Sequence, residues 1–297
     1  MHLEKTSEML GIMAALASAA SWAFGTVVFE RLGKHIPYAG ITFLKGTFSI
    51  ILMSLLALAM GDWSQISSRD AAILAASGII GISIGDTLFF RSLQDLGAKT
   101  QVLYFLLGQV VTMLLSFMLL GEVLGLTQYI GSTVLLCGIV VVTWGRQDDH
   151  PNKMRGIIGG LASILCFSIS TIMIKYTAPE INIVSSTLCR MFFGTLIITL
   201  LGVSTGKIKE WVKPLKDKRI LQWVVTNVAV ITIGGFVLSM YAVKKISVSL
   251  ASVLSVTEPV FVLGFAYIIN HEKASWREIV GASISVLGLL LIILNNG

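Results

Sequence analysis

Long apolar stretches, separated by short segments rich in charge, glycine or proline, occupy most of this 297-residue sequence. A helix that crosses a bilayer needs about 20 mostly apolar residues. Ten stretches approach or reach that length, at 10–29, 39–60, 71–92, 98–120, 127–144, 156–177, 183–203, 220–242, 247–269 and 276–294. Lipid cannot satisfy unpaired backbone groups, and the sequence lacks the two-residue alternation of a β-barrel strand. It therefore predicts an all-α integral membrane protein with ten transmembrane helices.

Composition supports this interpretation and excludes several classes of protein. Only 13% of the residues are charged and 55% are hydrophobic, whereas soluble domains carry about 25% charged residues. Ten spans leave no room for a separate soluble domain. We therefore expect the lipid bilayer as a partner, and we expect neither a soluble enzyme nor a nucleic-acid-binding protein.

Sequence signals for metal, phosphate or hydrolytic chemistry are missing. The three cysteines lie within apolar stretches, and the four histidines lie outside them without metal-ligand spacing. The sequence contains no phosphate-binding glycine loop and no His-Glu-x-x-His. Its two Gly-x-Ser-x-Gly matches, at 81–85 and 202–206, lie within or at the end of apolar stretches and not at a strand-to-helix turn, where a hydrolase would place them. We predict no metal, no cofactor and no enzymatic activity.

The two halves of the sequence resemble each other. Early matches are 145 residues apart: Gly11-Ile12 with Gly156-Ile157, Leu16-Ala17-Ser18 with Leu161-Ala162-Ser163, and Lys45 with Arg190. Later matches are 150 residues apart: Val110, Glu122, Gly131 and Gly138 with Val260, Glu272, Gly281 and Gly288. The longer connection at 202–219, compared with 61–70, accounts for the change in shift. We predict two five-helix repeats, 1–148 and 149–297.

Because five is an odd number, the second repeat must enter the bilayer in the opposite orientation to the first. Inverted repeats are typical of secondary transporters, which bind their substrate near the middle of the bilayer between the repeats. The two halves therefore predict transport as the function.

Several motifs in these repeats resemble the EamA family of the drug/metabolite transporter superfamily. They are the steps Gly121-Glu122 and His271-Glu272, the glycine pairs Gly131/Gly138 and Gly281/Gly288, and Glu258-Pro259 in the ninth span. The resemblance covers nearly the whole chain. It implies a ten-helix fold, alternating access, small organic solutes such as amino acids, and termini in the cytoplasm. One departure is Gly108-Gln109, which stands where the second half has Glu258-Pro259.

Two acids inside predicted spans are candidate substrate-binding and proton-coupling residues. A charge at the centre of a span costs on the order of 2.5–3.5 kcal/mol on insertion scales. Asp86 lies in the third span, one step round the helix from a stripe of glycines formed by Gly78, Gly81 and Gly85. It either binds a proton or an amine, or forms a structural ion pair with Arg91, Lys45 or Arg190. Glu258 has the same candidate roles, or it caps a helix that is broken at Pro259.

Lys45 and Arg190 occupy equivalent places in the second and seventh spans. They are candidates to hold a substrate carboxylate, or they snorkel to the interface. Aromatic residues that either line a cavity or only pack complete the candidate site: Trp22, Phe24, Phe89, Phe90 and Tyr104.

We therefore predict a secondary active transporter for a small polar organic metabolite, such as an amino acid or a related amine, coupled to protons as one option. A transporter of quaternary ammonium compounds is the alternative if the cavity is aromatic and acidic and both basic side chains turn away. A passive channel and an integral membrane lipid enzyme are alternatives from other classes.

The basic residues in the loops and the family resemblance predict opposite orientations of the termini in the cell membrane. Outside Lys45 and Arg190, five basic residues lie on the predicted side of the termini and fifteen on the other side, six of them between 207 and 219. The positive-inside rule would place the termini outside. We retain the cytoplasmic prediction, because that cluster lies in a single loop and acts late in insertion, after the orientation of the earlier spans has been fixed.

Overall fold

The computed structural model describes residues 2–60, 65–120, 126–143, 152–174, 176–177, 181–246, 254 and 257–294. All regular elements in these ranges are helical. In the first half they are α1 (His2–Leu32), α2 (Tyr38–Met60), α3 (Ser68–Gly78), η1 (Ile79–Asp86), α4 (Thr87–Leu96), α5 (Ala98–Leu120) and α6 (Leu126–Thr143). In the second half they are α7 (Lys153–Ile174), α8 (Ile183–Ser204), α9 (Ile208–Val212), η2 (Lys213–Lys216), α10 (Lys218–Ala229), η3 (Val230–Val237), α11 (Leu238–Lys245), α13 (Glu258–Asn270) and α14 (Trp276–Leu294).

Helix length and composition confirm an all-α membrane protein. In the described part of the chain, six helical stretches are long and apolar enough to cross a bilayer: Glu8–Leu32, Tyr38–Ala59, Ser68–Leu96, Ala98–Leu119, Lys153–Ile174 and Val184–Ser204. Shorter apolar helices cover Tyr129–Val141 and Glu258–Asn270. The predicted stretch 247–269 begins on residues outside the described ranges, and the division into ten spans and two repeats stays a prediction.

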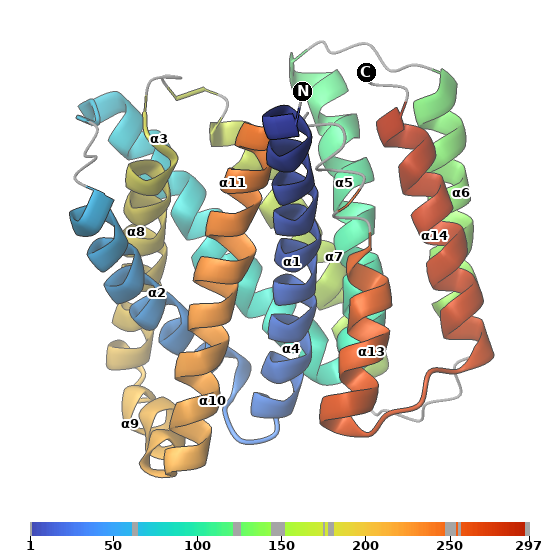
Figure 1. The fold of residues 1–297 in the computed structure, drawn as a ribbon. Helices are drawn as coiled ribbons and strands as arrows, with labels where there is room; N and C mark the ends of the chain where they lie inside the picture. Colours follow the sequence, from blue (N-terminus) through green and yellow to red (C-terminus); the bar gives the residue numbers. More distant parts are fainter. Residues whose placement is uncertain are drawn as a thin grey trace.

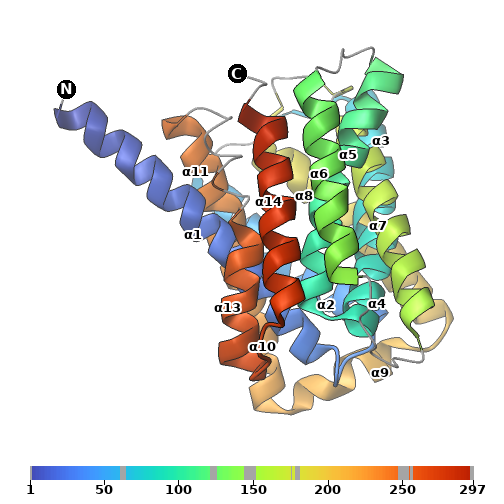
Figure 2. The same cartoon turned by 90° about the vertical axis from the view of Figure 1, so that its right-hand side faces the viewer.

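The helices pack side by side in one bundle, with both termini at the same end (Figure 1). The opposite end carries α9 and the start of α10, as the view turned by 90° also shows (Figure 2). Most close packing crosses between the two halves of the chain. In the first half, α1 lies against α11 and α13, and α2 against α8; in the second half, α7 lies against α4 and α5, and α14 against α6.

A buried apolar cluster fills the centre of the bundle. It joins residues from α1, α4, α5 and α13, among them Val27, Phe90, Leu103 and Val262, each no more than 2% exposed. Large apolar side chains are also exposed on the outside of the helices, for example Met118 and Ile268. This distribution suits a protein whose outer surface meets lipid rather than water.

Two π-helical segments of eight residues, η1 and η3, interrupt long helices in the two halves. Each lies between α-helices, in the orders α3–η1–α4 and α10–η3–α11. Such segments are rare and occur often at functional sites. The apolar pattern of the sequence does not reveal them, because it specifies a buried helix but not its hydrogen-bond period.

Glycines bring α6 and α14 into backbone contact. A Cβ atom built on Gly288 would lie 2.6 Å from the carbonyl oxygen of Gly131, and one built on Gly138 would lie 2.6 Å from that of Gly281. Between helices in lipid, association depends on such close packing because the hydrophobic effect contributes little. The glycine pairs noted in the sequence therefore have a packing role in this interface.

We predict that Gly288→Ala destabilises the protein by about 1–3 kcal/mol, because the backbone of α6 cannot yield to the added methyl group. The measurement is thermal unfolding of the purified protein in detergent. Gly264→Ala is the matched control, because a Cβ atom at Gly264 meets no atom within 4 Å. Equal melting temperatures for the two variants would contradict this role of the α6–α14 contact.

Candidate functional site

A partly buried ion pair joins two of the residues singled out in the sequence. The Lys45 Nζ atom on α2 donates a hydrogen bond of 2.8 Å to Oδ2 of Asp86, the last residue of η1. Their side chains are 19% and 8% exposed. Pairing offsets much of the cost of placing each charge among apolar helices. The structure thus contains the Lys45 ion pair that the sequence offered as one interpretation of Asp86.

Polar and aromatic groups surround this pair. The Lys45 Nζ atom lies 5.6 Å from the centroid of the Phe90 ring, which is within the range of a cation–π contact. One residue beyond Asp86, the Thr87 hydroxyl donates to Thr42 Oγ1 of α2 at 3.1 Å. These contacts hold α2 against the junction between η1 and α4, where the carboxylate lies.

Arg190 of α8 approaches the same helix from the other half of the chain. Its Nη2 atom donates to Ser170 Oγ at 3.0 Å and would lie 3.7 Å from a Cβ atom on Gly81 in η1. Its Nε atom is buried and has no hydrogen-bond partner among the described residues. The Arg190 guanidinium also interacts electrostatically with Asp86. Lys45 pairs directly with Asp86, whereas Arg190 acts on it at longer range, with no hydrogen bond or ion pair between the two in the described part of the chain. We call Lys45, Asp86 and Arg190 the charged centre.

Glycines and small residues make this approach of α8 possible. A Cβ atom on Gly194 would lie 2.6 Å from the Gly78 carbonyl oxygen, so the backbones of α3 and α8 touch. Ser77 and Ser170 add a hydrogen bond of 2.9 Å between α3 and α7. Of the glycines of the third span, Gly78 lies against the Arg190 backbone of α8, whereas Gly81 and Gly85 lie nearest to Ser170 and Phe167 of α7.

The predicted aromatic residues divide into two groups. Phe90 contacts Lys45 of the charged centre, and Phe89 contacts Phe90 edge to face, with ring centroids 5.3 Å apart. Phe90 is only 1% exposed, so it is a packed residue as well. Trp22 instead packs on Gly235, and Tyr104 is buried against Gly160. No described contact connects Trp22 or Tyr104 to the charged centre.

Glu258 lies apart from the charged centre in the described contacts. It is the first residue of α13, followed by Pro259 in the first turn, where a missing backbone N–H costs nothing. A carboxylate at a helix N-terminus is favoured by the helix dipole. Among the described residues, its carboxylate has no hydrogen bond or ion pair. The end-of-helix interpretation and the binding interpretation of Glu258 therefore both stay open.

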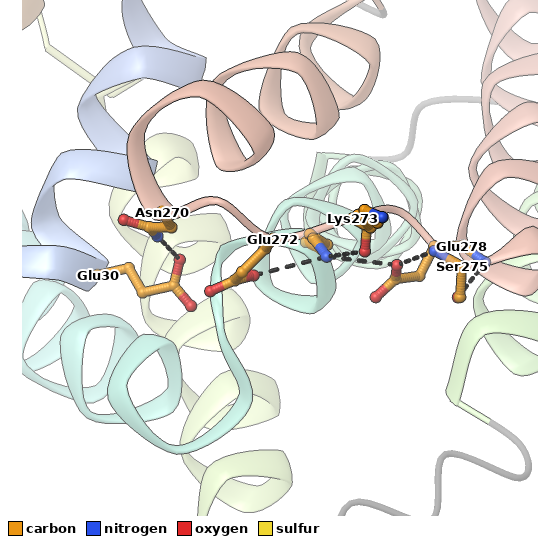
Figure 3. A network of polar contacts seen from close by, with 7 residues as sticks. Glu30, Asn270, Glu272, Lys273, Ser275 and Glu278 are labelled. Atoms are coloured by element: carbon orange, nitrogen blue, oxygen red, sulfur yellow. Dashed lines mark hydrogen bonds and ion pairs between the residues drawn. The ribbon is translucent and has the colours of Figure 1, made fainter.

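A polar network that the sequence did not predict lies at the end of the bundle opposite the termini (Figure 3). Lys99 of α5 donates to the Lys273 carbonyl oxygen at 3.0 Å and lies 3.5 Å from Oε2 of both Glu272 and Glu278. Its side chain is 8% exposed. Ser275 and Glu278 exchange hydrogen bonds at the start of α14, at 2.8 and 3.2 Å. The Ser-Trp-Arg-Glu pattern of a capping box was the available signal for part of this network.

The same end carries two further connections between the halves. Asn270 of α13 donates to Glu30 Oε2 of α1 at 2.9 Å (Figure 3). Arg155 of α7 forms a two-pronged ion pair with Asp95 of α4, with N···O distances of 2.6 and 2.8 Å. Polar contacts therefore tie the halves together around the 271–275 loop.

Comparison with known proteins places the chain in a family. The model of the EamA-like transporter family matches residues 9–144 and again residues 154–294. The chain belongs to the EamA-like transporter family. This membership confirms the resemblance noted in the sequence and makes the protein a multi-pass membrane protein of a transporter family.

Individual relatives of this EamA-like transporter are distant. An uncharacterized transporter of Archaeoglobus fulgidus is 22% identical over 96% of this chain and 99% of its own length. An uncharacterized transporter of Synechocystis is 22% identical over 90% of this chain and 79% of its own length. A crystal structure with 16% identity superimposes with a TM-score of 0.59 over 98% of this chain and 97% of the other. At that identity the likeness concerns the fold alone.

We predict that Lys45 and Asp86 are energetically coupled. Lys45→Met and Asp86→Asn each leave a buried charge without its partner and should lower stability, whereas the double variant should lose less than the sum by about 0.5–3 kcal/mol. The measurement is a double-mutant cycle by thermal unfolding in detergent. Additive losses would show that the 2.8 Å contact contributes no net stability.

Proposed function

We propose that this protein is a secondary active transporter that moves a small polar organic metabolite, an amino acid or a related amine, by alternating access. In this proposal ten membrane helices form two inverted repeats, residues 1–148 and 149–297. The family supports the general role of a transporter. The repeat architecture and the substrate class rest on the packing and the charges described above.

Reciprocal contacts support the two repeats. A Cβ atom on Gly85 would lie 3.0 Å from Phe167, and one on Gly235 would lie 2.9 Å from Trp22. These contacts are equivalent, because Gly85 and Gly235 are 150 residues apart and Trp22 and Phe167 are 145 apart. Two further equivalent pairs have matching distances: Gly11 with Lys245 and Gly156 with Asp95, both 2.8 Å, and Gly288 with Gly131 and Gly138 with Gly281, both 2.6 Å.

These pairs support a two-fold relation between the halves, because each contact recurs with the roles of the halves exchanged. The α1 helix packs against elements of the second half, and α7 packs against the equivalent elements of the first. Both termini lie at one end of the bundle, as ten spans require (Figure 1). In other transporters with inverted repeats, substrate sites lie between such halves near the bilayer midplane.

The charged centre is the observation that supports the substrate class. Asp86 is paired with Lys45 and lies within electrostatic range of Arg190, and these two cations stand 145 residues apart, at matching places in the sequence of the two halves. A zwitterion offers a second carboxylate and a second cation, so its ammonium can pair with Asp86 and its carboxylate with Arg190. Entry of such a substrate leaves the net charge of the site unchanged, which avoids the cost of adding charge to a poorly solvated region.

The orientation of the basic side chains favours a zwitterion over a quaternary ammonium compound. A site for a permanent cation suits aromatic walls and an acid without competing cations. Here Lys45 already forms an ion pair with Asp86, and Arg190 adds a second positive charge within electrostatic range. We therefore keep the quaternary ammonium transporter as the second candidate.

The two candidate proton-coupling acids, Asp86 and Glu258, differ in whether their carboxylates are paired. Asp86 is paired with Lys45 in the described state, so a proton on Asp86 would remove the charge attraction between the two side chains. The carboxylate of Glu258 has no hydrogen bond or ion pair among the described residues, so in this proposal it is free to take up a proton.

We propose cytoplasmic termini in the cell membrane, as the family resemblance implies. A cysteine label on either terminus tests this orientation.

We predict that Asp86→Asn abolishes counterflow of amino acids in proteoliposomes, because the substrate ammonium loses its carboxylate partner. Arg190→Gln should raise the apparent KM for substrates that carry a carboxylate by at least about tenfold, the size of one charge-assisted hydrogen bond. The same variant should leave transport of the matching decarboxylated amines nearly unchanged. Counterflow also separates a carrier from a passive channel, which does not show it.

Lys45→Met combined with Asp86→Asn is the control for folding, since it removes both charges together. Wild-type uptake of an amino acid panel by the Asp86→Asn variant would remove Asp86 from the mechanism. Uptake restricted to quaternary ammonium compounds would favour the second candidate.

A further inference from the structure

The connections at the end opposite the termini are made by charged groups that cross between the halves. Lys99, from the first half, is surrounded by three oxygen atoms from the second half: the Lys273 carbonyl at 3.0 Å and the carboxylates of Glu272 and Glu278 at 3.5 Å (Figure 3). The Lys99 side chain is almost fully buried. An ammonium group that is so little exposed depends on its protein partners, because burial removes most of its hydration.

A second charged contact crosses between the halves at the same end. Asp95 is near the end of α4, four residues before Lys99 in the chain, and its side chain is 5% exposed. Arg155, at the start of α7, approaches it with two parallel N–H donors at 2.6 and 2.8 Å. Bidentate pairs of this kind are stronger and more directional than single ion pairs. Separating the halves at this end therefore breaks both contacts.

The residues at the equivalent positions, at the end that holds the termini, cannot form the same ion pairs. At a shift of 150, Ser249 stands where the first half has Lys99, and Gln128 stands where the second half has Glu278. At shifts of 150 and 145, Asp95 and Arg155 correspond to Lys245 and Leu10. The other end thus has a serine and a leucine in place of the lysine and the arginine. The backbone contacts recur in both halves, but these ion pairs do not.

We propose that Lys99 and Arg155 act as a fastener that sets which side of the transporter is closed at rest, so that the resting protein opens toward the end holding the termini. This proposal rests on the alternating-access function proposed above. If the two halves are otherwise nearly equivalent, these two charged contacts lower the free energy of the state closed at their end, because the equivalent positions at the other end cannot form them. Lys99 therefore belongs to the transport cycle although it lies outside the charged centre.

The test measures access to the charged centre from each side of the membrane. Thr87→Cys, next to Asp86, serves as the reporter in a background with Cys137, Cys166 and Cys189 replaced by alanine. A membrane-impermeant thiosulfonate is applied to either side of sealed vesicles, and Lys216→Cys, exposed at the fastened end, identifies which side is which. We expect slow labelling of Thr87→Cys from the fastened side and faster labelling from the side of the termini.

Lys99→Met should raise labelling from the fastened side by about tenfold and lower it from the other side, since the balance between the two states shifts by one buried charged contact. Methionine keeps the length and burial of the side chain. Glu278 stays bonded to the Ser275 amide and Glu272 is 40% exposed, so neither is left buried and unpaired. Lys99→Arg should restore the original pattern.

Lys273→Gln is the matched control, because only the backbone carbonyl of Lys273 contacts Lys99. Wild-type labelling of a folded Lys99→Met protein from both sides would overturn the proposal, as would an equal rise from both sides, which indicates loosening rather than a shift. A different result would contradict the alternating-access function itself. Thr87→Cys would then react from one side only in every variant, and amino acid counterflow would be absent.

Discussion

Backbone contact through small residues is the constraint on which the rest of this structure depends. Lipid gives helices little hydrophobic reason to associate, so they adhere where their surfaces fit closely. Gly78 and Gly194 bring α3 against α8, and Gly131 and Gly288 bring α6 against α14. The first of these contacts also brings Arg190 close to Asp86. The packing of glycines thus creates the electrostatics of the charged centre.

The charges in this bundle are arranged in two different ways. Around Asp86, Lys45 takes the one carboxylate, and the Arg190 Nε atom has no hydrogen-bond partner in the described part of the chain. Around Lys99, one cation is surrounded by two acids and a carbonyl oxygen. An incompletely paired cluster suits a place where a ligand supplies the missing partner, whereas a fully surrounded ammonium suits a contact that holds two segments together.

Membership in the EamA-like transporter family gives the general role, and the family is broad enough that the role alone names no substrate. Residues at equivalent positions of the two halves are therefore the informative ones. Lys45 and Arg190 keep a positive charge at one such position, so both halves contribute a cation to the centre. Lys99 and Ser249 differ, so the two ends of the bundle are chemically unequal.

The sequence by itself determined the helical membrane class, the family and the candidate charges, because apolar length and unpaired charge are properties of single segments. It also predicted the glycine pairs that mark the α6–α14 contact. Only the tertiary structure selected Lys45 as the partner of Asp86, separated Trp22 and Tyr104 from that pair, and joined Lys99 to the 271–275 loop. These outcomes depend on distances between segments far apart in the chain, and helix rotation and the π-helical segments set those distances without a pattern in the sequence.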